Sequence, residues 1–318
     1  AAMATQVARQ LVGDPDLEIE LLGANTWTVN NCFATHMQKG RAFIMGDAAH
    51  RHPPSNGLGS NTSIQDGFNL AWKLAAVIKG QATPKLLDSY SAERAPVARQ
   101  IVTRANQSIA EFGPIFEALG MDGGVDHEKI QRSMAARCDA TPAAEQQREA
   151  LRKAIAFKKY EFDAHGVEMN QRYTSSAVVP DGTSAPVNDD MELYYQPTTH
   201  PGARLPHIWL YDRQGGKHST LDLTGKGRFT LLTGIGGEGW IAAAAKVSAE
   251  LGLPINAVKI GPRCDYEDHL GDWARASEVA DAGCVLVRPD HHVAWRSAAL
   301  SFNPQADLTR ALRQILGH

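Results

Sequence analysis

The segment 46–61 constrains this chain more than any other stretch of its 318 residues. An apolar run, which we expect to form a buried strand over 41–45, ends in Gly46-Asp47. A loop rich in proline, glycine, serine and asparagine follows and leads into a helical pattern. Thr62 stands three residues before a glutamine, as in a capping box, so the helix is expected to begin there. A strand end, a carboxylate, a glycine-rich bend and a helix start therefore follow one another closely.

This arrangement can bind a flat, polyhydroxylated ligand. Asp47, a carboxylate at a strand end, can accept hydrogen bonds from the hydroxyls of a ribose or a ribityl chain. Gly57 and Gly59 let the backbone approach a planar group closely, and the free amides expected at 60–62 favour partial negative charge. A reduced flavin, which is negative near N1 and the C2 carbonyl, fits these requirements. The same residues are equally typical of a plain loop before a capped helix, and the pattern alone does not choose between the two.

Composition and charge exclude several classes of protein. The chain is 43% hydrophobic and 21% charged, as globular proteins are, and its formal net charge of −3 offers no basic surface for nucleic acid. No stretch reaches the ~18 consecutive apolar residues of a membrane span, and the N-terminus lacks the layout of a signal peptide. The cysteines are spaced too widely for a zinc ribbon or a CxxC motif and predict a cytoplasmic protein without a disulfide framework; they are Cys32, Cys138, Cys264 and Cys284.

Helix and strand patterns alternate along the rest of the chain. The N-terminus is expected to be a helix that stops at Gly13, and Thr141 and Asn303 are the expected N-caps of two later helices. The other expected elements are strands over 17–22, 27–29, 32–36, 207–211, 229–233 and 257–260, a hairpin of 284–288 with 293–296, and helices over 62–78, 86–112 with a kink or break at Pro96, 141–165, 240–251 and from 304 onward.

This order of elements predicts an α/β fold in two parts. Glycine, proline, serine, threonine, asparagine and aspartate dominate 181–200, so we expect a linker or crossing segment there. That segment would separate a first domain over 1–180 from a second domain over 201–318, each of ordinary domain size.

Several motifs are shared with one enzyme family. They are Gly46-Asp47-Ala48-Ala49-His50, Pro53-Pro54, Gly57-x-Gly59-x-Asn61, Asp66-x-x-Asn69-Leu70-x-Trp72-Lys73-Leu74, Ser91-x-Glu93-Arg94-x-Pro96, Pro201-Gly202-x-Arg204-x-Pro206-His207 and Val293-Ala294-Trp295-Arg296. On these motifs the chain resembles the single-component FAD-dependent aromatic hydroxylases of the phenol and 2,4-dichlorophenol 6-monooxygenase type. The first four look like the family's second FAD-binding motif, and the last two resemble its C-terminal domain. The resemblance covers most of the chain.

The resemblance implies a fold and a set of cofactor contacts. The chain would be the C-terminal part of an FAD- and substrate-binding domain, followed by a thioredoxin-like α/β domain that lacks CxxC. Asp47 would bond the ribityl chain of FAD, Pro54 would lie beside the isoalloxazine ring, and the backbone of 59–61 would contact the pyrimidine edge of that ring. The implied cofactor-binding residues are Asp47, Pro54, Gly57, Leu58, Gly59, Ser60 and Asn61.

The resemblance also implies an activity. In this family NADPH reduces the FAD, O2 adds at C4a of the flavin, and the hydroperoxide so formed delivers one oxygen ortho to a phenolic hydroxyl. The cofactor carries out that chemistry, while the protein supplies position, dryness and electrostatics. We therefore expect a flavoprotein monooxygenase that acts on a phenol or a chlorophenol and forms a homo-oligomer.

One departure from the family pattern is large. The family's first FAD motif, a GxGxxG after the first strand, is not found before residue 47, and neither is the middle motif that contacts the pyrophosphate and the nicotinamide cofactor. The chain is therefore expected to be the C-terminal half of such an enzyme, with the missing N-terminal half as its partner. The alternative is a catalytically silent fragment with a structural or FAD-contacting role.

A second glycine-rich segment offers a different interpretation. Residues 234–239 satisfy GxGxxG between an expected strand and an expected helix, and Arg263 after the next strand suits a 2′-phosphate. On that interpretation the chain would be an NADP-linked reductase. Too few strand–helix units surround the segment for a complete nucleotide-binding domain, and the resemblance makes it a loop of the thioredoxin-like domain. We therefore expect a structural role for these glycines.

The histidines give one catalytic candidate. His50-x-His52 and His291-His292 lack the i,i+4 spacing and the supporting carboxylates or thiols of a metal site, so no metal is expected. His50 is expected to bond to the loop backbone, and His52 is expected to face the substrate. No GxSxG elbow is present, which excludes a nucleophilic hydrolase of that kind.

Overall fold

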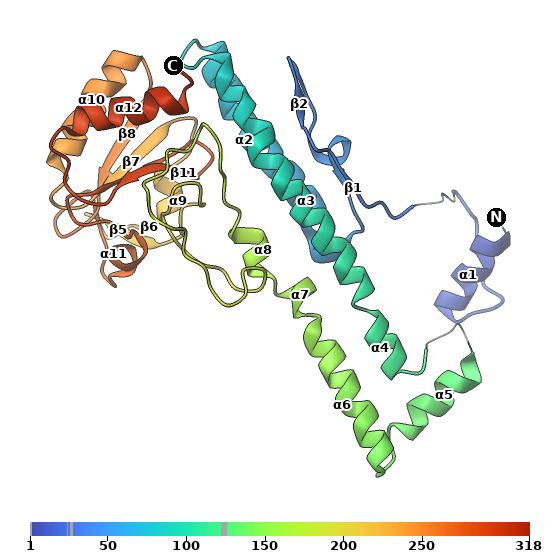
Figure 1. Cartoon of the computed structure of the whole chain (residues 1–318). Coiled ribbons are helices and arrows are strands. Elements are labelled where there is room, and N and C mark those ends of the chain that lie inside the picture. The colour runs from blue at the N-terminus through green and yellow to red at the C-terminus, as the bar shows by residue number, and fades with distance from the viewer. Residues whose placement is uncertain (1, 24, 26–27, 122–125) are drawn as a thin grey trace. The chain divides into compact units, whose positions relative to one another are not determined.

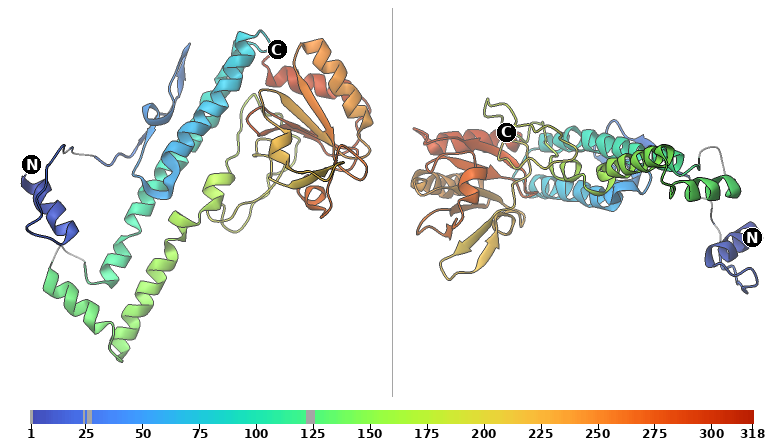
Figure 2. Two further views of the ribbon diagram at one scale, coloured as in Figure 1. Left: turned by 180° about the vertical axis from the view of Figure 1, so that it is seen from behind. Right: turned by 90° about the horizontal axis from the view of Figure 1, so that it is seen from below.

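Two compact units make up the chain. The computed structural model describes residues 2–23, 25, 28–121 and 126–318. The backbone contacts divide the chain into residues 1–30 and residues 31–318, and each unit is compact by itself (Figures 1 and 2). None of the described helices is both long enough and apolar enough to cross a membrane.

The first unit is built on one helix, α1 (Ala2–Val12). The helix ends where it is predicted to end: Gly13 takes a φ of +80°, and its amide donates to the carbonyl of Arg9. The strand predicted over 17–22 is wrong, because these residues form no ladder with any described strand and an alternating pattern needs such a partner. Of the strand predicted over 27–29, Trp27 lies outside the described residues, and the other two residues are not in a strand.

The second unit begins with short strands around two long helices. Strand β1 pairs with β4 and β2 pairs with β3, both antiparallel. Helices α2 and α3 run side by side (Figure 1). The elements of this part are β1 (Cys32–Phe33), β2 (Gln38–Lys39), β3 (Ala42–Phe43), β4 (His50–Arg51), the 3₁₀ turns η1 (Gly46–Ala48), η2 (Ser55–Gly57) and η3 (Pro84–Leu87), and the helices α2 (Leu58–Ile78), α3 (Asp88–Ala110), α4 (Gly113–Ala118), α5 (His127–Ala136), α6 (Pro142–Phe157), α7 (Lys159–Phe162) and α8 (His165–Met169).

A kink or a break is predicted in α3 at Pro96, and of these the break is wrong. Pro96 lies inside the helix, and the helix continues through it as one element. Proline removes one backbone hydrogen bond. The buried residues just beyond it, Val97 and Ile101, pack into a core cluster with Leu58 and Val167, and this packing holds the helix together across the missing bond.

The helix predicted over 141–165 is divided into α6, α7 and α8. Thr141 caps α6 as predicted, since its hydroxyl accepts a hydrogen bond from the Ala144 amide at 3.2 Å. The division comes at Lys158, whose side chain turns into the core. Its ammonium donates to the carbonyl of Ser108 at 2.6 Å, which fixes the end of α6 against α3.

The C-terminal part has an α/β sheet topology that fits the thioredoxin-like domain implied by the resemblance. Its central sheet has the strand order β11-β10-β7-β8; β7 and β8 are parallel, and β10 is antiparallel to both β7 and β11. The predicted strands and helices are confirmed to within a few residues, and Asn303 caps the last helix by accepting from the Ala306 amide. The elements are β5 (Trp209–Asp212), β6 (Lys217–Ser219), α9 (Thr220–Leu223), β7 (Phe229–Thr233), α10 (Glu238–Leu251), β8 (Ile255–Lys259), β9 (Tyr266–Glu267), α11 (Asp272–Ala276), β10 (Cys284–Val287), β11 (Val293–Ser297) and α12 (Pro304–Ile315).

Helices cover both faces of this sheet (Figure 2). Successive residues of a strand point to opposite faces. Accordingly, Leu231 and Leu286 pack with α10 and α12, whereas Leu232 and Val285 pack on the other face, where Trp273 of α11 lies.

The core beneath α10 and α12 extends onto α2. Trp72 packs edge-to-face on Phe229 of β7, with the ring centroids 5.7 Å apart, and Ala76 and Leu86 belong to the same cluster. The segment 181–200 contains no helix or strand. The domain boundary predicted there stays a prediction, because one hydrophobic core joins residues from both sides of it.

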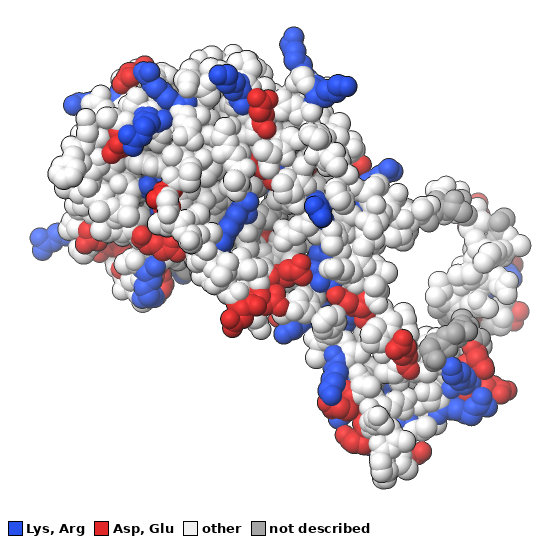
Figure 3. Space-filling view, viewed as in Figure 1, with Lys and Arg blue, Asp and Glu red and all other residues white. Residues whose placement is uncertain are grey.

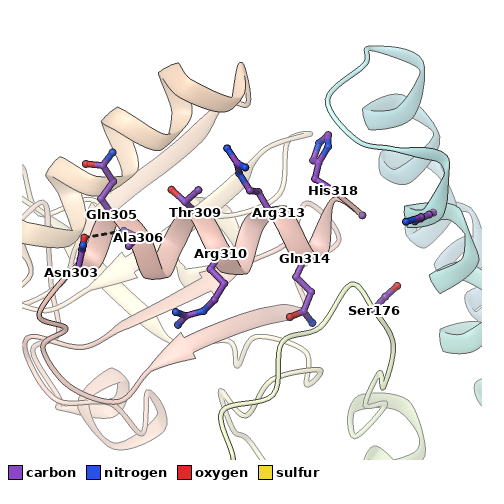
Figure 4. Close-up of a pocket in the computed structure, with 11 residues that line it drawn as sticks. Ser176, Asn303, Gln305, Ala306, Thr309, Arg310, Arg313, Gln314 and His318 are labelled. Carbon is purple, nitrogen blue, oxygen red and sulfur yellow. Dashed lines mark hydrogen bonds between the residues drawn. The ribbon is translucent and has the colours of Figure 1, made fainter.

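Charges of both signs lie on the surface. On the face shown in Figure 3, basic and acidic side chains are interspersed. A wide hollow of about 1000 Å³ follows α12 (Figure 4). Two of its arginines form ion pairs at the surface, Arg310 with Asp307 at 2.8 Å and Arg313 with Glu250 at 3.1 Å.

Candidate functional site

Contacts with buried side chains hold the turn at Gly46 and Asp47 rigidly. Gly46 has a φ of +56°, which favours glycine, and a Cβ atom there would also crowd the Ser63 hydroxyl at 3.0 Å. The Gly46 amide donates to a carboxylate oxygen of Asp66 at 3.1 Å. Asp47, the next residue, is exposed. The fold therefore fixes the backbone of this turn while its carboxylate faces outward.

The run before this turn differs from the predicted buried strand. Strand β3 is short, and Ile44 and Met45 are 38% and 42% exposed. The Tyr90 hydroxyl donates to the carbonyl of Ile44 at 2.9 Å, so α3 holds the backbone here in place of a neighbouring strand. An apolar run does not by itself predict burial, because the residues that cover it must also be present.

The helix after the loop begins a turn earlier than predicted. Helix α2 starts at Leu58, with Gly57 as its N-cap in the left-handed region at a φ of +63°. Thr62 is therefore inside the helix, and the capping box predicted there is wrong. No side chain caps the helix start, so the free amides are those of residues 58–60 rather than 60–62. This end of the helix carries partial positive charge that a ligand can meet.

Two asparagines shape the loop. Asn61 donates from its side chain to the carbonyl of Gly57 at 2.8 Å, which closes the first turn of α2. Asn56, at a φ of +62°, donates to the carbonyl of Tyr160 at 2.8 Å and ties the loop to α7. Within the described residues, the Asn56 side-chain oxygen and the Ser55 hydroxyl are buried without a hydrogen-bond partner. Orphaned polar atoms beside an uncapped helix start fit a loop that meets a polar cofactor.

The implied flavin-contacting residues fall into two groups. The side chain of Leu58 turns into the core and packs on Val97, so only its backbone can meet a cofactor. Gly59 is half-buried, with the ring of His52 close to it. The remaining residues are all exposed and follow one another around the loop and the helix start: Asp47, Pro54, Gly57, Ser60 and Asn61.

The two loop histidines have different environments. His50 is buried, and its Nε2 lies 2.8 Å from an Asp66 oxygen. It therefore bonds to a side chain, whereas a bond to the loop backbone was predicted. His52 is half-buried, and its Nδ1 lies 2.7 Å from the carbonyl of Pro53. Its role facing a substrate stays a prediction.

A buried carboxylate joins the loop to α3. One oxygen of Asp66 accepts from Arg94 Nε at 2.7 Å, and the other meets both His50 and the Gly46 amide. Burial by itself would raise the pKa of Asp66, but the bond to His50 and the charge of Arg94 hold that pKa below its usual value. The Gly46 turn thus rests on a permanently ionised support at neutral pH.

A second buried carboxylate, Glu93, lies next along α3. It accepts from Lys73 at 2.7 Å, from Asn69 at 2.7 Å and, with both oxygens, from Arg288 at 2.6 and 2.8 Å. Burial would raise the pKa of Glu93, and Arg288 and Lys73 hold it well below its usual value. Burial lowers the pKa of Lys73 to about 8. These charges are isolated from water and depend on one another.

Sequence reasoning missed this cluster. The motifs that contain Asp66, Asn69, Lys73, Glu93 and Arg94 carry the family resemblance, but nothing in them predicted that these side chains meet. A usable signal was present: charged and amide side chains recur at three- and four-residue spacing along the inner face of an otherwise apolar helix. Such residues are buried only when they are paired.

The protonation of His292 should make the fold sensitive to mild acid. This side chain is buried and stacked on Tyr173, and burial lowers its pKa from 6.5 to about 4. Between those values the unfolded chain binds a proton that the folded chain does not, so stability falls as the pH drops from about 6.5 to about 4. We expect His292→Gln to lose less stability than the parent between pH 7 and pH 5, measured by urea unfolding.

The control for this test is His127→Gln, at an exposed site. It should follow the pH dependence of the parent. If His292→Gln also followed the parent, another group would have to account for the loss.

A cavity of about 460 Å³ lies beside the start of α2. Asn61 and Phe68 of α2 line one side, and Arg204 and His291 line the other. Phe68 lies against the His291 ring, with centroids 5.5 Å apart. The cavity therefore joins the helix start to the C-terminal domain.

The second glycine segment has the predicted structural role. The Gly236 amide donates to the carbonyl of Asp281 at 3.1 Å, and a Cβ atom on Gly234 would lie 2.5 Å from that same carbonyl oxygen. A Cβ atom on Gly237 would lie 2.0 Å from the Thr233 hydroxyl. The glycines are thus needed where this loop packs closely on its neighbours. Across the described residues, no group of three or more His, Cys, Asp or Glu side chains is arranged to hold a metal ion.

Two family models match the chain. Residues 1–105 match the FAD binding domain family, and residues 198–318 match the C-terminal family of the aromatic-ring hydroxylases.

Proteins of known function and solved structures give the same relationship. The chain is 51% identical to 2,4-dichlorophenol 6-monooxygenase of Cupriavidus pinatubonensis, over 99% of this chain and 53% of that protein. It is 49% identical to phenol 2-monooxygenase of a Pseudomonas species, over 96% of this chain and 50% of that protein. The crystal structure of the flavin-dependent monooxygenase PieE with FAD and substrate superimposes with a TM-score of 0.91 at 43% identity, over 99% of this chain and 54% of that one. The chain thus spans about half the length of the relatives it matches.

Proposed function

The chain belongs to the FAD-dependent aromatic-ring hydroxylases, and from that premise we propose that it acts as part of a monooxygenase that hydroxylates a phenol or a chlorophenol ortho to its hydroxyl, with NADPH and O2 as co-substrates. We further propose that an N-terminal half like that of its relatives completes the FAD site. The observation that carries the proposal is the uncapped start of α2 beside the exposed carboxylate of Asp47.

The loop and helix start are suited to hold a flavin. Bound FAD would supply the redox chemistry and the activation of O2. Asp47 would accept hydrogen bonds from ribityl hydroxyls, and the free amides of 58–60 would stabilise negative charge at the pyrimidine edge of the ring. The exposed Pro54 would line the edge of the ring. The buried support of Asp66 keeps these groups in one arrangement, so little reorganisation is needed on binding.

The apolar rim of the site suits an aromatic substrate. Met45, Ile64 and Phe68 are 42%, 69% and 47% exposed, and they lie on the turn and on the first turns of α2. Once covered by the other half, these side chains would exclude water from the reacting centre, which favours transfer of oxygen to the substrate over its loss. The names of the relatives support a phenol as the substrate class.

Replacement of Asp47 tests the proposed flavin site. We expect Asp47→Ala to weaken FAD binding by about tenfold or more, because a charge-assisted hydrogen bond to the ribityl chain is lost. The binding can be followed by titrating the chain with FAD and measuring flavin fluorescence. With the N-terminal half present and with FAD and NADPH supplied, the parent protein is expected to oxidise NADPH only when a chlorophenol is added.

The matched control is Asp281→Ala. Asp281 is also exposed, but it packs beside the second glycine segment. FAD affinity should not change in this variant. Equal affinity in both variants would reject Asp47 as a flavin ligand, and an effect of Asp281 alone would move the nucleotide site to the second glycine segment.

A further inference from the structure

The thioredoxin-like domain is bonded to the two helices that support residues 46–61, which we call the flavin loop. The turn between β10 and β11 carries Arg288, Asp290 and His292, all buried. Arg288 pairs with Asp290 through Nη2 at 2.5 Å and with both oxygens of Glu93 on α3. Asn69 of α2 donates to both Glu93 and Asp290, at 2.7 and 3.3 Å. The turn is therefore bonded to both long helices.

A second connection runs through Tyr173. Its ring stacks on His292, with centroids 4.1 Å apart, and the Arg288 guanidinium lies 5.3 Å from its centroid. Its hydroxyl accepts from Arg94 Nη1 at 3.0 Å. One aromatic side chain thus contacts the C-terminal turn on its face and the arginine beneath the flavin loop at its edge.

The arginine at that point has no freedom to absorb a shift. Arg94 donates from Nε to Asp66, from Nη1 to Tyr173 and Gln171, and from Nη2 to the carbonyl of Thr62. A guanidinium is planar and its donors form a rigid fork, so moving one of these bonds moves the others.

The last step reaches the flavin loop itself. Asp66 is fully buried, and its two oxygens are divided between Arg94 on one side and the pair of His50 and the Gly46 amide on the other. A rotation of the Arg94 guanidinium therefore turns the carboxylate that carries Gly46. Asp47, the proposed ribityl ligand, is the very next residue.

We propose that the thioredoxin-like domain sets the conformation of the Gly46-Asp47 turn through Arg288, Tyr173 and Arg94, which act as positioning residues for the flavin. The flavin part of this inference rests on the proposed function; the coupling between the C-terminal turn and Gly46 does not. The domain has no redox cysteine pair, and the proposed role does not require one. The domain acts by positioning the turn, through buried hydrogen bonds and ion pairs whose geometry is fixed.

Hydrogen exchange of the chain alone measures the coupling. The Gly46 amide is bonded to Asp66, so its exchange reports local opening of that bond. Tyr173→Phe keeps the stacked ring and removes only the hydroxyl, and Arg288→Lys keeps the charge and removes the two-pronged contact. We expect each variant to raise exchange in a peptide covering 46–51 by about tenfold relative to the parent, as loss of a bond to a charged group implies.

The matched control is Arg296→Lys, in β11 of the same domain. Arg296 is also buried and ion-paired, with Asp181 at 2.6 Å and with Glu278 at 2.5 Å, but these partners do not lead to α3. Exchange in 46–51 should match the parent in this variant, while exchange around its own partners rises. If Arg296→Lys opened 46–51 as much as Arg288→Lys, the effect would be general loosening and the proposal would be overturned. Unchanged exchange in both Tyr173→Phe and Arg288→Lys would overturn it as well.

Flavin binding then separates this inference from the proposed function. Faster exchange at 46–51, together with weaker FAD binding in Tyr173→Phe, supports both. Faster exchange in a chain that does not bind FAD keeps the coupling and rejects the flavin role. If Tyr173→Phe binds FAD as the parent does despite faster exchange, Tyr173 is not a positioning residue for the flavin.

Discussion

Arg288→Met is expected to lower the free energy of unfolding by about 3–5 kcal/mol. The guanidinium is fully buried and is bonded to Glu93 and Asp290, both of which are also buried. Removing it leaves Asp290 buried without its cation and leaves Glu93 with Lys73 alone, and the penalty for this uncompensated buried charge is much larger than the net value of the ion pairs themselves. Methionine fills a similar volume, so a cavity contributes little to the loss.

Urea unfolding monitored by circular dichroism measures this loss. Arg313→Met is the control, because Arg313 is 55% exposed and its pair with Glu250 is at the surface; a change of at most about 1 kcal/mol is expected there. Adding Asp290→Asn to Arg288→Met removes the carboxylate whose ion-pair partner is lost and should restore part of the stability. Equal losses for Arg288→Met and Arg313→Met would mean that the buried cluster is open to water.

Gly202→Ala should be comparably damaging, for a different reason. Gly202 has a φ of +91°, and a Cβ atom there would lie 2.1 Å from the carbonyl oxygen of Tyr173. Its own backbone is fixed on both sides: its amide donates to Val293, and its carbonyl accepts from the Tyr173 amide. Backbone strain costs about 1–3 kcal/mol and overpacking about 1–3 kcal/mol more. The alanine variant should therefore lose roughly 2–6 kcal/mol, again by urea unfolding.

Gly215→Ala separates the two contributions. Gly215 also has a positive φ, of +82°, but nothing lies within 4 Å of the Cβ position. This variant should show the backbone strain alone and lose no more than about 3 kcal/mol. If Gly202→Ala proved at least as stable as Gly215→Ala, the Tyr173 backbone would be able to move aside at little cost.

Much of the fold could be predicted from local patterns. Strand β7 has the predicted bounds, because five apolar or β-branched residues between turn signals favour a buried strand. Helix α12 begins at the predicted cap of Asn303, and α1 ends at the predicted Gly13. In each case the signal lies within a few residues of the element that it determines.

The errors come from interactions between distant residues. The Thr62 pattern resembles a capping box, yet Gly57 begins the helix earlier because its left-handed conformation is set by the loop as a whole. The run over 41–45 resembles a buried strand, although burial depends on what covers it. The cluster around Glu93 joins residues 195 positions apart in the chain, and no local pattern carries that information.

The flavin contacts were predicted from a motif, and their support was not. Asp47 and the helix start could be proposed because a carboxylate, glycines and free amides have known ligand chemistry. Asp66 and Arg94 hold that loop in place, but their partners come from three separate segments of the chain. The sequence alone indicates which groups can bind a flavin, but it does not indicate which side chains fix those groups in position.

The contact of Trp72 with Phe229 also bears on how such proteins diversify. Because α2 supplies part of the hydrophobic core beneath α10 and α12, the C-terminal domain does not have a core that is complete without α2. If recombination exchanged this domain without its matching α2 surface, Trp72 would be exposed to water. The core beneath α10 and α12 of the new domain would then contain an unfilled cavity. Inheritance of the two parts as a single block avoids both defects.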